Sequence, residues 1–174
     1  MVVPSHVVRG RSSWAASSEA ASSWPAPSGV GGRAESSLWL TQRFAEGQNY
    51  SIDLEASRAV CRVWSRPDLD TAQGAALAVE KIVLFRRLAQ GNIREMLFDL
   101  TRAPAVTGPI TQAALGEMMQ AWEQAGKPIA VVSGAVSIQQ LQLRRLVTTF
   151  APQQGALFTA LEDATAWLDS RHNR

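Results

Sequence analysis

Three short apolar runs in the second half of the chain constrain its fold more than any other feature. They are EMLFDL at residues 95–100, PIAVVS at 128–133 and ALF at 156–158. Continuous apolar runs are typical of strands that are covered on both faces. Because a segment with helical spacing of apolar residues follows each run, we expect strands and helices to alternate. Such alternation predicts a sheet with parallel neighbours and right-handed crossovers.

Two more strands are expected ahead of this alternating part. Residues 50–54 and 59–64 alternate apolar and polar side chains around a short turn, which predicts an antiparallel hairpin. Asp70 and Gln73 have the spacing of a capping box and predict a helix over residues 71–89. The expected order is ββαβαβαβα, an α/β fold with a mixed sheet of about five strands and flanking helices.

The expected helices carry apolar faces that would cover the sheet. After the helix at residues 71–89, the other helices are expected at residues 109–124, at 137–150 and from residue 159 onward. Trp122 and Trp167 fall on apolar stripes and are expected in the core. Gly74 and Gly116 lower helix stability and therefore predict close packing. In the first helix the expected apolar face consists of Leu77, Val79, Val83, Leu84 and Leu88.

Residues 1–47 are rich in Ser, Ala, Gly and Pro and have neither helical nor strand periodicity. Such a segment buries too little apolar surface to offset the entropy of ordering, so we expect a disordered tail. Trp14, Trp24 and Trp39 leave two interpretations open, a short motif that folds onto a partner or chance composition. An alternative for the end of this segment is a short flanking helix that packs Leu38, Trp39, Leu40 and Phe44 against the domain.

The folded domain is expected over residues 48–170, followed by a frayed C-terminus at 171–174. The single cysteine, Cys61, lies in an apolar alternating stretch and is expected to be buried without a disulfide. The chain has neither a long apolar run nor the apolar region of a signal peptide near its start. We therefore expect a cytoplasmic domain without membrane insertion.

Histidine is too scarce for most catalytic and metal sites. The two histidines, His6 and His172, lie near the chain ends, where an imidazole is not held beside a nucleophile or a metal ion. The formal net charge is +2, without the clustered basic residues of a nucleic-acid-binding face. The sequence therefore predicts a protein that is not an enzyme, with no cofactor, no metal and no nucleic-acid partner.

The element order, with the strand LFDL leading into a Thr-Gly loop at a helix start, resembles the STAS domains of anti-sigma-factor antagonists. It also resembles related STAS-like and SEC14-like single-domain bacterial proteins, over residues 49–168. The resemblance implies a regulatory or scaffolding module whose partner is a kinase or an anti-sigma-type regulator. In the family, a loop of the form Asp-Ser-Ser/Ala-Gly carries the phosphorylated serine. Here Ala105 and Val106 occupy the aspartate and serine positions, so the usual phosphoserine switch is not expected.

The candidate partner-binding residues lie in the loop after residues 95–100 and at the start of the next helix. They are Asp99, Arg102, Val106, Thr107, Gly108 and Ile110. Thr107 precedes Gly108 at an expected helix N-terminus, so it is either the N-cap or a displaced phosphorylation site. Asp99 either faces a ligand at a strand end or fixes the loop through backbone N–H groups. Arg102 would pair with Asp99 or with an anionic partner.

Arg144 and Arg145 lie on the expected helix that follows residues 128–133. Gln139, Gln140 and Gln142 form a polar face beside them. This face is either a solvated helix surface or a recognition surface for an acidic partner.

Four hypotheses for function follow from these observations. The leading one is a non-enzymatic regulator that docks on a protein partner through residues 104–122. The main alternative is a small-ligand or lipid-binding module of the same architecture, because apolar helices that flank a sheet can enclose a pocket. An enzyme that uses carboxylates and a homo-oligomeric subunit that assembles through the hairpin edge are the others.

Overall fold

The computed structural model describes residues 41–104, 108–134 and 137–172, which belong to one compact unit, Leu38–Arg174. The strands of this part are β1 (Gln42–Gly47), β2 (Tyr50–Glu55), β3 (Arg58–Trp64), β4 (Glu95–Arg102), β5 (Ile129–Ser133) and β6 (Gly155–Phe158). The helices are α1 (Thr71–Gln90), α2 (Pro109–Gln124), α3 (Ser137–Phe150) and α4 (Leu161–His172).

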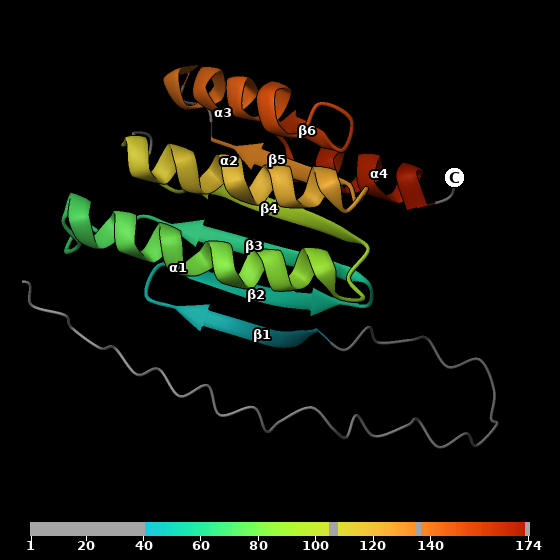
Figure 1. The fold of residues 1–174 in the computed structure, drawn as a ribbon, viewed down its shortest axis with the longest axis horizontal. Coiled ribbons are helices and arrows are strands. Elements are labelled where there is room, and N and C mark those ends of the chain that lie inside the picture. The colour runs from blue at the N-terminus through green and yellow to red at the C-terminus, as the bar shows by residue number, and fades with distance from the viewer. Residues whose placement is uncertain (1–40, 105–107, 135–136, 173–174) are drawn as a thin grey trace, which may run out of the picture. The chain divides into compact units, whose positions relative to one another are not determined.

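The strands form one mixed sheet in the order β1-β2-β3-β4-β5-β6 (Figure 1). β1, β2 and β3 are antiparallel to one another, whereas β3 to β6 run parallel. Right-handed crossovers that always step in the same direction place their helices on the same face. α1, α2 and α3 therefore cover one face, and α4 covers β4, β5 and β6 on the other. The predicted α/β fold is confirmed, with six described strands in place of about five.

β1 lies within the segment 1–47 that the sequence predicts to be a disordered tail, so that prediction is wrong for residues 42–47. The alternative of a short flanking helix is wrong at Phe44, which belongs to this strand, and its other residues, 38–40, lie outside the described residues. The pairing of β1 with β2 shifts its register between Arg43 and Ala45, which marks a β-bulge at Phe44. The folded domain therefore begins several residues earlier than expected.

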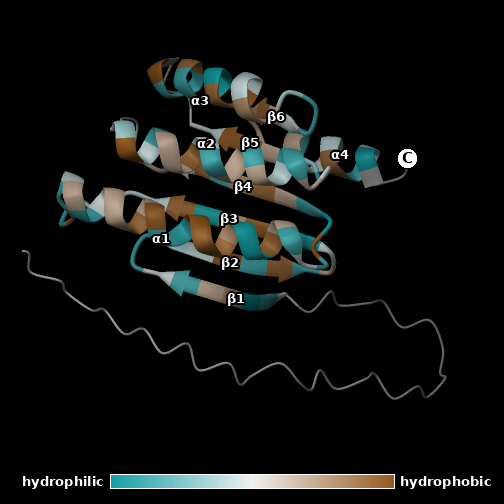
Figure 2. Cartoon of the chain, viewed as in Figure 1, coloured by the Kyte–Doolittle hydropathy of each residue, from teal (hydrophilic) through white to brown (hydrophobic). Residues whose placement is uncertain are grey.

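Ion pairs across three strands explain why β1 is ordered despite its polarity. Asp53 of β2 is only 5% exposed and accepts hydrogen bonds from Arg43 of β1 and Arg62 of β3. Figure 2 shows that β1 is mainly hydrophilic, whereas β4 is mainly hydrophobic. A hydrophilic edge strand lacks the apolar alternation by which a strand is recognised in a sequence.

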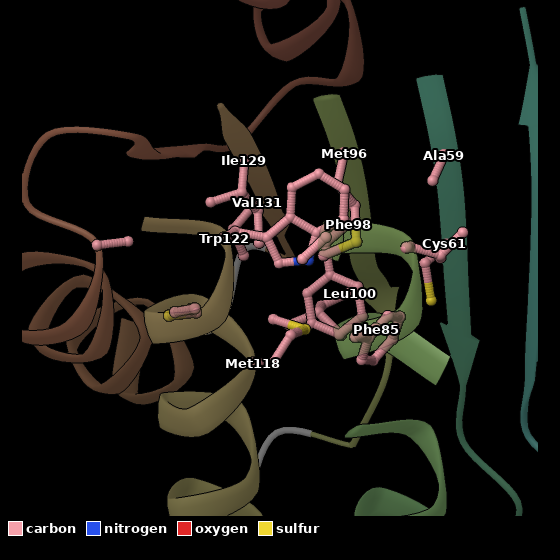
Figure 3. Close-up of a cluster of buried hydrophobic side chains, with 14 of the residues drawn as sticks. Ala59, Cys61, Phe85, Met96, Phe98, Leu100, Met118, Trp122, Ile129 and Val131 are labelled. Atoms are coloured by element: carbon pink, nitrogen blue, oxygen red, sulfur yellow. The ribbon is translucent and has the colours of Figure 1, made fainter. Parts of the chain in front are cut away.

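The larger part of the core lies between the sheet and α1, α2 and α3. Figure 3 shows Trp122 among Met96, Phe98 and Val131, so that α2, β4 and β5 meet at this indole ring. Trp122 is fully buried, as predicted. Phe85 of α1 packs edge-on against Phe98, with ring centroids 5.6 Å apart.

The smaller part of the core lies under α4. Trp167 is partly buried and packs against Phe158 of β6, with ring centroids 5.7 Å apart. The guanidinium of Arg171 lies 4.8 Å from the Trp167 ring centroid and donates to the carbonyl of Gln153. The expectation of a frayed C-terminus at 171–174 is thus wrong for its first two residues, which belong to the last turn of α4.

The buried face of α1 differs from the predicted one. Asp70 and Gln73 form the predicted capping box. Val79 and Val83, however, are 49% and 60% exposed, so their assignment to the core face is wrong. The buried residues are instead Ala78, Lys81, Ile82, Phe85, Leu88 and Ala89. No helix of the described residues has both the length and the hydrophobicity needed to cross a membrane.

The two glycines singled out in the helices behave differently. A Cβ at Gly116 of α2 would lie 2.9 Å from Cε2 of Phe150, so the prediction of close packing is confirmed there. A Cβ at Gly74 of α1 would meet no atom within 4 Å, and the same prediction is wrong.

Candidate ligand-binding cavity

A cavity of about 270 Å³ lies between the sheet and the N-terminal parts of α1, α2 and α3. Val63, Phe98 and Leu100 line it near the carboxyl ends of β3 and β4. The carboxyl ends of parallel strands are where α/β proteins commonly bind ligands. The volume is close to the lower end of the range for small-molecule sites.

Small side chains explain why the helices leave this space open. Gly74, Ala75 and Ala78 of α1 line the cavity, and Ala114 of α2 lines it from the neighbouring helix. Ala78 and Ala114 also pack with Ile82 in a small buried cluster where the two helices meet. Residues of this size hold the helices together but cannot fill the volume beside them, whereas protein interiors are otherwise close-packed.

Two of the charged residues at the cavity have partners of their own. Nε of Arg66 donates to Asp68 at 2.7 Å. A side-chain oxygen of Asp70 accepts a hydrogen bond from the backbone N–H of Gln73 at 2.7 Å, as the N-cap of α1. Both groups are therefore already engaged in local structure.

Lys81 is the third charged residue that lines the cavity, and it is 7% exposed. Its Nζ donates to Oδ1 of Asn49 at 3.0 Å and lies 5.1 Å from the ring centroid of Tyr50. It forms no salt bridge with any described residue, and burial lowers the pKa of Lys81. Lys81 is not among the residues singled out from the sequence, although its position between Ala78 and Phe85 on the apolar stripe is a visible signal.

Asp99 fixes the end of β4 and does not face the cavity. Its Oδ1 accepts hydrogen bonds from the backbone N–H of Thr101 at 2.9 Å and from its hydroxyl at 2.7 Å. This is the loop-fixing alternative considered for the residue. Arg102 is exposed at the end of β4 and does not pair with Asp99.

Gly108 is the N-cap of α2, with an extended backbone and no side-chain cap, so the assignment of that position to Thr107 is wrong. Pro109 follows at the first helical position, where its fixed φ favours the helix start. Ile110 is 58% exposed, and Gly108 lines the cavity. Val106 and Thr107 lie outside the described residues.

The predicted polar face of α3 is only partly correct. Arg144 and Arg145 are exposed, as both interpretations of this face require. Gln139, by contrast, is 4% exposed and lines the cavity. Its Nε2 donates to the carbonyl of Pro104 at 3.4 Å, which connects α3 to the loop after β4.

Within the described ranges, His, Cys, Asp and Glu side chains do not gather into a group that could hold a metal ion. The cavity and its buried lysine are therefore the features from which function can be inferred. Comparison of the chain with known protein families, curated proteins and solved structures gives no match.

Proposed function

We propose that this protein is a non-enzymatic module that holds a small, mainly apolar molecule in the cavity between α1, α2 and α3. The observation that carries the proposal is the cavity itself, whose wall is mostly apolar with a few polar groups at fixed positions. Small-molecule sites generally have this composition. Filling the cavity with apolar atoms would also restore dispersion contacts that its lining residues lack.

The proposal can be tested with an uncharged probe, 1-octanol, and a matched pair of variants. Ala75→Trp places a large side chain at a cavity-lining position of α1. Ala76→Trp adds the same side chain at the next residue, which is exposed and does not line the cavity. A ligand that binds only the folded state raises the free energy of unfolding by about 2.7 kcal/mol at a hundredfold excess over Kd.

We expect 1-octanol to raise the melting temperature of the wild type and of Ala76→Trp but not of Ala75→Trp. Native mass spectrometry of freshly purified protein should also show a retained small molecule in the first two proteins. The proposal fails if the wild type neither retains a molecule nor responds to the probe, or if both variants respond alike.

A second candidate function is docking of a protein partner, favoured by apolar side chains exposed at the helix starts. Ile110 of α2 and Ile138 and Leu141 of α3 are 58%, 64% and 67% exposed. Ile110→Asp should then reduce capture of a partner by the purified protein. Val83→Asp on α1, an equally exposed position, should leave capture unchanged. Equal capture by both variants would count against docking at Ile110.

A further inference from the structure

Lys81 has fewer partners than a buried ammonium group needs. It carries three N–H donors, and one hydrogen bond, to Asn49, is found within the described residues. The nearest carboxylate on its own helix, Glu80, accepts a hydrogen bond from the hydroxyl of Tyr50 at 2.9 Å. Removing an ionised group from water is costly unless the group is paired and hydrogen-bonded.

Lys81 and Asn49, the partner of its Nζ, both line the cavity. Among the charged residues that line it, Arg66 is paired with Asp68 and Asp70 caps α1. Lys81 is therefore the one lining cation that is free to pair with a ligand in the described part of the chain. Apolar side chains of α2 and α3, including Met118, Leu143 and Leu146, form the wall beyond it.

We propose that the ligand of the cavity is a small amphiphile with one carboxylate, such as a medium-chain fatty acid. Its carboxylate pairs with Nζ of Lys81 and its alkyl chain lies against the apolar side chains of α2 and α3. This inference rests on the proposed function, because it names the class of molecule that the cavity holds. A carboxylate supplies both the missing negative charge and acceptors for the remaining N–H groups.

Three properties of the site favour this class over others. An uncharged molecule would leave the ammonium unpaired, and a cation would be repelled by it. The cavity volume of about 270 Å³ excludes a ligand with several long chains. A multiply charged anion would bring more negative charge than Lys81 can balance, and its desolvation would oppose binding.

The test compares sodium octanoate with 1-octanol, which have the same chain length and differ in charge. Affinities for both are measured by isothermal titration with the full-length wild type, Lys81→Met and Lys81→Arg. Arg86→Met serves as the control for general loss of positive charge, because Arg86 is an exposed residue of the same helix that does not line the cavity.

We expect the wild type to bind octanoate more tightly than octanol. Lys81→Met should weaken the binding of octanoate by about tenfold or more, which is the usual contribution of a charged hydrogen bond. The same variant should have little effect on the binding of octanol. Lys81→Arg should retain the preference for octanoate, and Arg86→Met should behave as the wild type. The comparison of the two ligands on the wild type holds even if a variant does not fold.

The outcomes separate this inference from the proposed function. Equal affinity of the wild type for octanol and octanoate, or equal weakening of both by Lys81→Met, overturns the inference and leaves the cavity as a neutral apolar site. Failure of the wild type to bind either ligand overturns both.

Discussion

Nζ of Lys81 donates to Oδ1 of Asn49 at 3.0 Å, and this hydrogen bond joins α1 to the residue that precedes β2. Burial lowers the pKa of Lys81 from its ordinary value of 10.5, while Cys61 and Glu80 oppose the shift. The folded protein therefore binds the lysine proton less tightly than the unfolded chain does. This difference makes stability depend on pH at the alkaline end.

We expect the free energy of unfolding of the ligand-free wild type to rise, relative to that of Lys81→Met, as the pH approaches 10.5 from below. In this range the unfolded chain keeps the lysine proton and the folded protein releases it, so raising the pH favours folding. Below the lowered pKa both states are protonated and the difference between the two proteins is constant. Urea unfolding at a series of pH values measures the effect, and a constant difference up to pH 10.5 would contradict it.

Cys61 should produce an opposite dependence, which begins above pH 9. It is fully buried, as the sequence predicts, and burial raises the pKa of its thiol above the ordinary value of 9.0. Above pH 9 the unfolded chain loses the thiol proton while the folded protein retains it. Stability then falls with rising pH, by up to about 1.4 kcal/mol per pH unit from this group.

Cys61→Ala should remove that part of the slope, although its loss of volume lowers stability at every pH. Tyr50→Phe is the matched comparison, because burial and the bond to Glu80 raise the pKa of Tyr50 from 10.0 to about 12. The loss of stability due to Tyr50 should therefore begin near pH 10, one pH unit above that due to Cys61. The same slope in the wild type and Cys61→Ala between pH 9 and 10 would be evidence against this assignment.

The two helical glycines should respond in opposite ways to alanine. Gly74→Ala should stabilise the protein by up to about 1 kcal/mol, because alanine favours the helix and its Cβ meets no atom within 4 Å. Gly116→Ala should be about 1–3 kcal/mol less stable than Gly74→Ala, because its Cβ would press on the ring of Phe150. Chemical unfolding of both variants measures the difference, and equal stabilisation would show that Phe150 moves aside freely.

The ion pair between Arg58 of β3 and Glu95 of β4 should contribute strongly to the free energy of unfolding. The Nε and Nη2 atoms of Arg58 each lie 2.7 Å from Oε1 of Glu95, and the two side chains are 16% and 6% exposed. Glu95→Ala leaves a mostly buried guanidinium without this partner, which should cost about 3 kcal/mol in the free energy of unfolding.

Arg58 also contacts Asp169 of α4, whose side chain is 62% exposed. Asp169→Ala is therefore the control, with an expected loss below about 1 kcal/mol. Similar losses in the two variants would show that burial does not decide the strength of these pairs.

The strands that could be predicted from the sequence are those whose burial is visible as a run or an alternation of apolar residues. β5 is buried at every position, and its run of apolar residues is visible in the sequence. β1 could not be found in this way, because it is held by its ladder to β2 and by the bond from Arg43 to Asp53. Both are contacts between segments, and neither leaves a periodic pattern in β1 itself.

The candidate site was harder to predict than the fold. The cavity exists because the small residues Gly74, Ala75 and Ala78 leave space open beside α1. Its walls also come from three helices that approach one another only in the folded chain. Lys81 was visible on the apolar stripe of α1, but a lysine at such a position normally extends to solvent. Gly108 was singled out from the sequence as a partner-binding residue, and in the structure it lines the cavity and begins α2.

The sequential order of the six strands has a consequence for how the chain reaches its native state. Each strand of the sheet pairs with the strand that comes just before or just after it along the chain. Each closure therefore spans at most one helix and its connections, and closing it costs less entropy than pairing strands from opposite ends of the domain. Chains with such local connectivity fold faster than those that must pair distant segments. The sheet can thus grow one strand at a time from the β2–β3 hairpin, without waiting for the two ends of the domain to meet.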